Sequence, residues 1–180
     1  QAILNGLALV TNDRKASGLV LSMSVTANVV MADLKRLSPW GVRRPADEIR
    51  AAEEHASALR IRAASLKMDA GELSGGNQQK VVLAKWMQTR PGMLLMDEPT
   101  RGVDVGAKNE IYHLMNRLTQ EGIGILLITS EMPELLAMSD RIVVMHRGRI
   151  TAEFSRQEAT PQRVLAAAMG KAHDGKRNNI

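Results

Sequence analysis

Strand-like apolar runs alternate with amphipathic stretches along much of the chain. Four runs have the length of strands: residues 7–10, 93–96, 123–129 and 141–145. Residues 108–121 carry apolar side chains at the three- and four-residue spacing of one helix face, at Ile111, Leu114, Met115 and Leu118. This alternation predicts an α/β fold with a mostly parallel sheet.

Further patterns place helices and turns between and after these runs. Helical spacing of apolar residues covers 47–59 and 77–88, and a short helix is expected near 133–138. Gly122 is expected to end a helix in a left-handed conformation, and Thr160 with Pro161 predicts a capped helix that stops near Gly170. The polar tail, residues 171–180, is expected to be frayed.

The run at 93–96 is bounded by proline and glycine on one side and by acids and Pro99 on the other. An uninterrupted apolar run of this length is typical of a strand buried on both faces of a parallel sheet. We therefore expect both faces of this strand to be covered.

The bulk composition indicates one globular unit that does not cross a membrane. The chain has 180 residues, 44% of them hydrophobic, which is enough for a single core. It has no cysteine, which fits a reducing compartment and excludes disulfides and thiolate metal sites. The apolar run at 123–128 is far shorter than the roughly 20 residues that span a bilayer. The first fifteen residues do not have the pattern of a signal peptide, and we expect the chain to be a fragment that starts inside a fold.

The net charge of +5 raises the question of nucleic-acid binding. Only 2% of the residues are aromatic, so surfaces for base stacking are scarce. Much of the positive charge comes from Arg43, Arg44, Arg50, Arg60, Arg62 and Lys67. We interpret these residues as a solvated helical face, with contact to a partner or to lipid headgroups as the alternative.

Two acids follow the apolar run at 93–96. Asp97 and Glu98 would lie at the carboxyl end of a buried parallel strand, where open α/β sheets bind ligands. One acid there can hold a hydrated Mg²⁺ on nucleotide phosphates, and its neighbour can orient or deprotonate an attacking water. The alternative is that both acids only cap the strand and the turn after it.

A serine and two glycines, Ser74, Gly75 and Gly76, precede the amide-rich stretch that begins at Asn77. A glycine inside a helix costs roughly 1 kcal/mol relative to alanine, so the pair should have a conformational or close-approach role. The alternative is an ordinary flexible turn.

The motifs "LSGGNQQK", "LLMDEPTRGVD", "ITSEMPE" and "SDRIVVMHRGRI" resemble, in order and spacing, the ATP-binding subunits of ABC transporters. Within this family the stretches "TNDRKASGLVLSMSV", "TRGVDVGAK" and "AAAMGK" are most similar to the second nucleotide-binding half of the double-domain ATPases of bacterial monosaccharide importers of the ribose type. The resemblance implies a P-loop NTPase-like (RecA-like) core with an inserted ABC helical subdomain, ATP and Mg²⁺ as cofactors, and ATPase activity.

The resemblance also implies roles for individual residues. Ser74, Gly75, Gly76 and Asn77 match the signature motif, which in the family caps the γ-phosphate of ATP held by the opposite nucleotide-binding domain. Backbone N–H groups without intervening side chains can close on an anion at the start of a helix, which suits this role.

The strand-end acids and two further positions receive roles in the same way. Asp97 matches the Walker B aspartate that holds Mg²⁺ through water, and Glu98 the acid that polarises the hydrolytic water. Asp104 matches the D-loop aspartate that links the two sites across the dimer, although a purely turn-forming role is as good an explanation of that residue alone. Asn12 stands at the Q-loop position that senses Mg²⁺ and couples to the permease, with a shorter amide than the family's Gln or Glu.

Two departures from the family pattern change the expected mechanism. Ser130 stands where the family has its switch histidine, and a hydroxyl neither carries charge nor reaches as far as imidazole. No G-x-x-x-x-G-K-[ST] loop occurs in the sequence, so the main cradle of the nucleotide must lie upstream in a longer protein. We therefore expect this half's own site to be degenerate, and the isolated chain to be inactive.

The resemblance divides the whole chain, residues 1–180, into four parts of one nucleotide-binding domain. These are a core strand with the Q-loop-like turn, the helical signature subdomain, the RecA-like core, and a C-terminal helix with tail, at residues 1–19, 20–90, 91–158 and 159–180. The expected partners are a second nucleotide-binding domain, on the same polypeptide or a dimer mate, transmembrane permease subunits and, indirectly, a periplasmic sugar-binding protein. Nucleic acid is not an expected partner. The expected location is peripheral, on the cytoplasmic face of the bacterial inner membrane.

Two other functions remain open at this level. One is an ABC-type ATPase that acts on nucleic acid or ribosomes. The basic charge favours this alternative, and the absence of flanking coiled-coil heptads argues against it. The other is a non-catalytic interaction module. The identity of the transported sugar is not encoded here, because substrate choice lies in the binding protein and the permease.

Overall fold

The computed structural model describes residues 1–170 and divides the chain into two compact units. The first unit comprises residues 1–128 and the second begins at Thr129. The predicted tail at 171–180, including Lys171 of "AAAMGK", lies outside the described residues. The four-part functional division remains a prediction.

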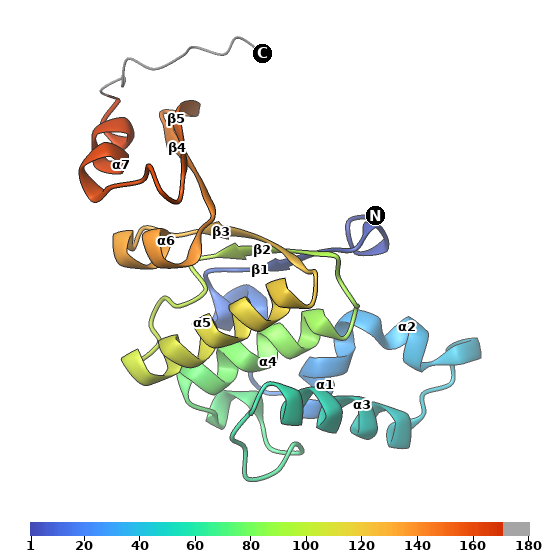
Figure 1. The fold of residues 1–180 in the computed structure, drawn as a ribbon. Helices are drawn as coiled ribbons and strands as arrows, with labels where there is room; N and C mark the ends of the chain where they lie inside the picture. The colour runs from blue at the N-terminus through green and yellow to red at the C-terminus, as the bar shows by residue number, and fades with distance from the viewer. Residues whose placement is uncertain (171–180) are drawn as a thin grey trace. The chain divides into compact units, whose positions relative to one another are not determined.

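The first unit contains a three-stranded parallel sheet with the order β1-β2-β3 (Figure 1). Its strands are β1 (Leu7–Val10), β2 (Met93–Asp97) and β3 (Gly124–Ile128). All three coincide closely with apolar runs in the sequence. The predicted α/β class with a parallel sheet is confirmed.

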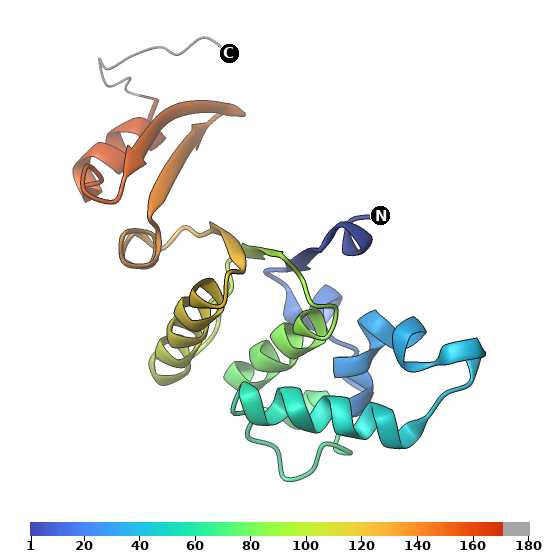
Figure 2. The same ribbon diagram turned by 45° about the vertical axis from the view of Figure 1, so that its right-hand side comes forward.

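One face of this sheet is buried and the other is open. Ala8, Val10, Leu94 and Met96 are fully or almost fully buried. On this side the sheet contacts α4 (Gly75–Met87) and α5 (Val105–Gln120), which both ribbon views place on the same side of the sheet (Figures 1 and 2).

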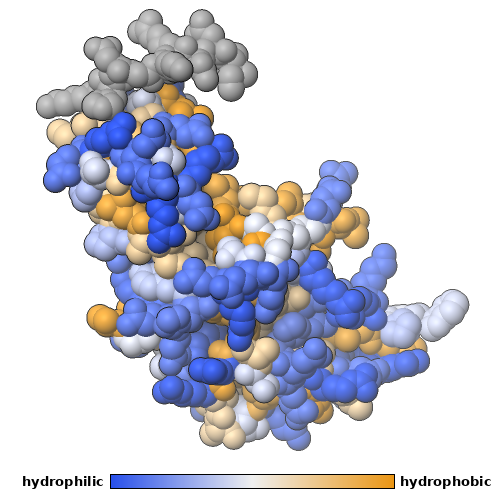
Figure 3. Space-filling view, viewed as in Figure 1, coloured by the Kyte–Doolittle hydropathy of each residue, from blue (hydrophilic) through white to orange (hydrophobic). Residues whose placement is uncertain are grey.

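The opposite face carries Leu9, Met93, Leu126 and Ile128, which are between about a third and a half exposed. Hydrophobic surface is visible beside the sheet in Figure 3. The expectation that residues 93–96 are covered on both faces is therefore wrong for this chain. An apolar run shows that a strand can be buried on both sides, but the run does not supply the element that covers the second side.

The remaining helices of the first unit form a layer next to α4. The α-helices are α1 (Val25–Val30), α2 (Leu34–Leu37) and α3 (Pro45–Ala58). The short 3-10 and π turns are η1 (Ile3–Asn5), η2 (Arg14–Gly18), η3 (Met31–Asp33), η4 (Pro39–Gly41) and η5 (Ala70–Glu72). Helix α1 contacts α3 and α4, and its side chains Val25 and Val29 are fully buried. The buried amide of Asn28 bonds both the N–H and the C=O of Val20, which fixes the chain where it enters this layer.

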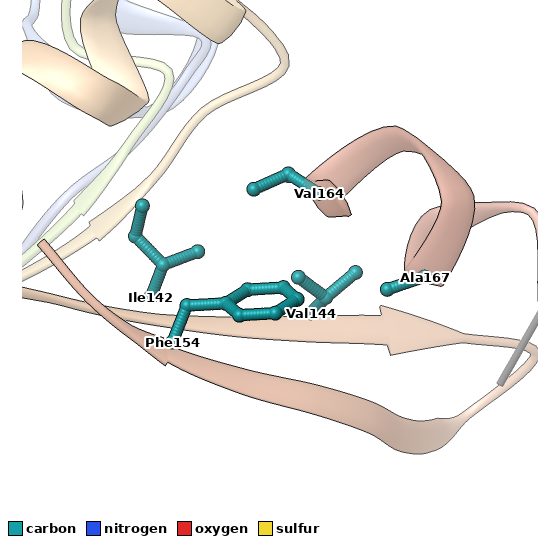
Figure 4. Close-up of a cluster of buried hydrophobic side chains, with 5 residues drawn as sticks. All are labelled: Ile142, Val144, Phe154, Val164 and Ala167. Carbon is teal, nitrogen blue, oxygen red and sulfur yellow. The ribbon is translucent and has the colours of Figure 1, made fainter. Parts of the chain in front are cut away.

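The second unit contains α6 (Met132–Met138), an antiparallel hairpin of β4 (Arg141–His146) and β5 (Arg149–Ser155), and α7 (Pro161–Ala168). Its core is small, and the five buried side chains in Figure 4 are Ile142, Val144, Phe154, Val164 and Ala167. Thr160 caps α7 by accepting from the N–H of Arg163, with Pro161 at the first position, as predicted.

Two boundaries show how local chemistry ends and starts helices. Gly122 has φ +89 and follows α5, which confirms the predicted left-handed stop. The helix expected over 77–88 begins two residues earlier, because Ser74 adopts the extended conformation of a cap and both glycines join the first turn.

Candidate functional site

The strand-end acids lie at the carboxyl end of β2, as predicted. Asp97 is the last residue of β2, and Glu98 follows with φ +47, a left-handed conformation that a side chain other than glycine rarely adopts. The Glu98 N–H donates to the C=O of Ile128 at 2.8 Å, and its C=O accepts from the N–H of Arg101 at 3.1 Å. The conformation costs about 1 kcal/mol, and strain of this kind concentrates at functional positions.

A connecting turn, residues 98–104, leads from β2 to α5. Thr100 in this turn is 1% exposed, and Gly102 takes a left-handed conformation with φ +65. The turn ends at Asp104, whose Oδ1 accepts from the N–H of Ala107 at 2.9 Å. Asp104 is thus the N-cap of α5, and this hydrogen bond gives its carboxylate a structural role within the chain. Its role across a dimer remains a prediction.

The diglycine turn, residues 74–77, opens helix α4. The Ser74 hydroxyl makes no capping bond to the backbone and instead accepts from the Asn77 amide at 3.0 Å. The Asn77 oxygen accepts from the N–H of Arg62 at 2.8 Å. Both polar groups of the Asn77 side chain therefore bond within the chain. The NH2 group fixes the Ser74 hydroxyl, and the oxygen fixes the backbone at Arg62.

Packing inside the chain explains why both positions after Ser74 are glycine. A Cβ on Gly76 would lie 2.5 Å from the Cβ of Ala107, so any side chain would push α4 and α5 apart. A Cβ on Gly75 would lie 2.8 Å from Nη2 of Arg14 and 3.3 Å from the C=O of Gly102. Close approach is thus the role that the sequence indicated. The prediction that these glycines also make room for a phosphate remains open to test.

A cluster of charges supports the diglycine turn from the α5 side. Lys80 is 4% exposed, and its ammonium donates to a Glu110 carboxylate oxygen and to the C=O of Arg60. Arg62 reaches the other Glu110 oxygen at 3.3 Å. The Lys80 bond and charge hold the pKa of Glu110 below its ordinary value of 4.5. The carboxylate therefore stays ionised and ties α4 to α5.

A hollow of about 200 Å³ lies between the first turns of α4 and α5. Its lining includes four of the predicted site residues, Ser74, Gly76, Asn77 and Asp104. The structure thus brings these four residues together, although 27 or more positions separate Asp104 from the other three.

Asn12 lies at a different hollow. It is exposed in the turn after β1, at a cavity of about 320 Å³ lined by Asn12, Asp13, Arg14, Lys15 and Arg101. Asp13 orders this turn by accepting from the N–H groups of Lys15 and Ala16. Arg101 belongs to the connecting turn, so the Asn12 turn and the connecting turn are neighbours.

Arg14 is the residue of this region that sequence reasoning missed. Its guanidinium bonds the connecting turn and helix α4 at once. The only signal in the sequence was a cation next to the Q-loop-like position, and a pattern read along one segment cannot show which distant carbonyls it meets.

Ser130 belongs to the second unit and lies two residues after the end of β3 in sequence. Near it, the Thr129 hydroxyl accepts from the N–H of Glu131 at 3.1 Å, which turns the chain toward α6. Its proposed role at the switch-histidine position remains a prediction.

The carboxylates at the end of β2 suit a hydrated Mg²⁺ and not an ion enclosed by protein ligands. Within residues 1–170 no group of three or more His, Asp or Glu side chains could enclose a metal ion. The pair Asp97 and Glu98 nevertheless fits a hydrated Mg²⁺, because this ion keeps several waters and needs only one or two carboxylates besides substrate phosphates. For ATP, the P-loop motif is absent from the sequence, and the hollow beside the diglycine turn is the place where residues 74–77 could meet an anion. No helix of the described residues is long and apolar enough to span a membrane.

Comparison with known proteins relates the chain to ATP-binding proteins of ABC transporters. A family profile described as "ABC transporter" matches residues 5–101. The chain is 49% identical over 170 residues to the xylose import ATP-binding protein XylG of Geobacillus kaustophilus (strain HTA426), covering 94% of this chain and 34% of that protein. It is 52% identical over 169 residues to XylG of Moorella thermoacetica (strain ATCC 39073 / JCM 9320), covering 94% and 33%. The chain thus spans about a third of the length of these relatives.

Solved structures agree with this at the level of the fold. A nucleotide-free ATP-binding cassette from an ABC transporter superimposes with a TM-score of 0.73 at 24% identity, over 92% of this chain and 66% of that one. An ATP-binding cassette of an ABC transporter in its ADP conformation gives a TM-score of 0.70 at 23% identity, over 93% of this chain and 70% of that one.

Proposed function

The chain belongs to the ABC transporter family, and we propose that it forms part of the ATP-binding subunit of a sugar importer. In this proposal it is the C-terminal part of the second nucleotide-binding domain, and it presents the diglycine turn to ATP bound by the first domain. About 50% identity to xylose import ATP-binding proteins supports the transport of a pentose or a similar monosaccharide.

One observation carries the phosphate-capping role. The contact of Gly76 with Ala107 brings the first turns of two long helices to the same hollow. At the α4 N-terminus no side chain caps the first N–H groups, and these groups together with the positive end of the helix dipole favour an anion. At the α5 N-terminus the Asp104 carboxylate already accepts from the Ala107 N–H, so the proposed anion is held from the α4 side. A terminal phosphate of a nucleotide is an anion of suitable size for such a hollow.

The other site residues have separate tasks in this proposal. Asp97 would hold hydrated Mg²⁺ through water, and Glu98 would polarise a water for attack on the γ-phosphate. When bound, Mg²⁺ supplies charge neutralisation of the phosphates. The Glu98 backbone is tied to Ile128, which fixes the point from which its side chain projects. Ser130 cannot carry the positive charge that histidine can, so this half's own site turns over more slowly than the partner site.

The proposed partners follow from the same role. They are the first nucleotide-binding domain of the same polypeptide or a dimer mate, and permease subunits at the cytoplasmic face of the membrane. Nucleic acid is not proposed, because several of the basic residues already pair with acids, as Arg43 does with Glu48 and Arg50 with Asp47. In each such pair the acid offsets positive charge that a phosphate backbone would otherwise meet.

The test is ATP turnover by the full-length protein with its permease in vesicles, in two variants of one position. Gly75 is the better site than Gly76, since a side chain on Gly75 meets mainly the flexible end of Arg14 and one on Gly76 meets Ala107. Gly75→Asp places a negative charge at the phosphate cap, and Gly75→Asn has nearly the same shape without the charge. We expect Gly75→Asp to hydrolyse ATP about 100-fold more slowly than Gly75→Asn. Equal rates in the two variants would reject the capping role.

A further inference from the structure

Arg14 joins three separate segments with one side chain. It sits at the start of η2, directly after the Asn12 turn. Its Nη1 donates to the C=O of Arg101 at 2.8 Å, and its Nη2 to the C=O of Gly102 at 3.1 Å. Its Nε donates to Oε1 of Gln78 in α4 at 3.4 Å. The guanidinium thus links the Asn12 turn to the connecting turn and to the helix that the diglycine turn opens.

We propose that Arg14 is a positioning residue for ATP turnover, which holds the connecting turn and the diglycine turn in one fixed arrangement. This proposal rests on the proposed function. In this proposal Arg14 does not contact the nucleotide. It acts through Gly102, two residues before the Asp104 cap, and through Gln78, one turn into α4.

The space around Arg14 is shaped for a guanidinium. Nη2 lies so near Gly75 that a Cβ there would be 2.8 Å away, and a Cβ on Gly102 would lie 3.7 Å from it. On the other side, a Cβ on Gly18 would be 3.2 Å from the Cβ of Arg14. Three glycines therefore surround this side chain, and the first glycine of the diglycine turn is one of them.

The base of Arg14 is also fixed. Asp13 caps η2 before it, and the C=O of Gly18 at the end of η2 accepts from the Lys85 ammonium. Lys85 is 6% exposed and belongs to α4, so η2 is attached to α4 at both of its ends. Because the backbone around Arg14 is held in this way, a displacement of the Asn12 turn is passed through the guanidinium to the two carbonyls and the amide that it bonds.

The chemistry of the contact requires arginine. A guanidinium offers five N–H donors in a rigid plane, which suits two neighbouring carbonyls and a side-chain amide at once. A lysine ammonium is a compact point donor on a flexible stem, and it can serve one or two of these acceptors at a time. Arg14→Lys therefore keeps the positive charge and loses the link between the segments, so it separates the effect of the charge from the effect of the link.

The test uses the full-length protein with its permease and the variants Arg14→Gln and Arg14→Lys. Arg50→Gln is the matched control, because Arg50 is exposed and, within residues 1–170, pairs with Asp47. Hydrogen–deuterium exchange reports the backbone, and steady-state ATP hydrolysis reports kcat and KM. We expect both Arg14 variants to exchange about tenfold faster than wild type at residues 101–107, with Arg50→Gln unchanged. We expect kcat to fall at least about tenfold with the KM for ATP within about twofold of wild type.

The outcomes separate this proposal from the proposed function. Unchanged exchange at 101–107 in Arg14→Gln would show that the link does not exist. Faster exchange with wild-type kcat would show that the link has no part in turnover, and a rise in KM alone would assign Arg14 to nucleotide binding instead. Full recovery of kcat in Arg14→Lys would contradict the need for a planar donor. A wild-type protein without ATPase activity would overturn the proposed function and the role in turnover together, while the exchange data would still decide on the link.

Discussion

Gly76 in α4 and Ala107 in α5 approach so closely that a Cβ on Gly76 would lie 2.5 Å from the Cβ of Ala107. Real Cβ atoms do not approach each other to this distance, so one helix must move if Gly76 gains a side chain. We expect Gly76→Ala to lower the free energy of unfolding by about 1–3 kcal/mol, measured by denaturant titration.

The double variant Gly76→Ala with Ala107→Gly provides the control for that prediction. Removing the Ala107 methyl restores the space, so the two changes should be strongly non-additive, with a coupling of at least about 0.5 kcal/mol in a double-mutant cycle. Simple additivity would show that the clash is relieved elsewhere and that the contact does not constrain Gly76.

Asp104 has one established task within the chain, the cap of α5, and one proposed task across a dimer. Asp104→Ala removes the acceptor of the Ala107 N–H and should cost about 1 kcal/mol of stability. Asp104→Ser keeps a capping oxygen and should retain nearly all of it. If Asp104→Ser folds normally and ATP turnover also stays at the wild-type level, the carboxylate has no role beyond the cap.

The backbone of Glu98 can be tested separately from its side chain. Glu98→Gly and Glu98→Ala both remove the carboxylate, but glycine adopts the observed φ of +47 without a steric penalty. The glycine variant should therefore be about 1 kcal/mol more stable than the alanine variant by thermal or chemical unfolding. Equal stabilities would mean that the turn relaxes and that the left-handed conformation is not enforced.

The Lys80–Glu110 pair should make stability depend on pH in the acid range. The folded pKa of Glu110 is lowered by Lys80, so the unfolded state takes up this proton first as the pH falls. The contribution is complete above the unfolded value near 4.5, and it disappears as the pH decreases through the lower folded pKa. Glu110→Gln should flatten the pH dependence of the unfolding free energy below about pH 5.

A matched control for this measurement exists at the C-cap of the same helix. Glu121 is exposed and lies 3.9 Å from Arg117, a geometry that contributes little. Glu121→Gln should change stability by less than about 0.5 kcal/mol and leave the acid slope as in wild type. If both glutamine variants have the same slope, the buried ammonium of Lys80 is not what lowers the pKa of Glu110.

A substitution at Ser130 tests which of the two proposed ATP sites limits the rate of hydrolysis. If hydrolysis occurs mainly where the first domain's ATP meets this chain's diglycine turn, Ser130→His in the full-length protein should change turnover by less than about twofold. A large gain would show that the site next to Ser130 was limiting, and that its histidine position matters to the overall rate.

The sequence predicted the framework of the fold well because strands and helices obey local periodicity. Residues 7–10, 93–97 and 124–128 form the parallel strands, and the helix before Gly122 ends where a left-handed residue was expected. The exposure of Met93 and Leu126 was not predicted, since it depends on which element lies over the sheet and not on the strand itself.

The candidate site could be predicted only in part. The sequence indicated a conformational or close-approach role for Gly75 and Gly76, with a phosphate as the expected group, and it could not identify Ala107 and Arg14 as groups that approach them. Arg14 itself escaped notice because its acceptors are backbone carbonyls, which every residue has and no side-chain pattern marks. Contacts of this kind become visible only when distant segments are placed in space.

The open face of the three-stranded sheet should affect the solution behaviour of the purified 180-residue chain. Leucine and isoleucine side chains that water cannot solvate well will drive copies of the chain together as it is concentrated. Its apparent melting temperature should then depend on how much protein is in the cuvette, and a dilution series is the first measurement to make before variants are ranked.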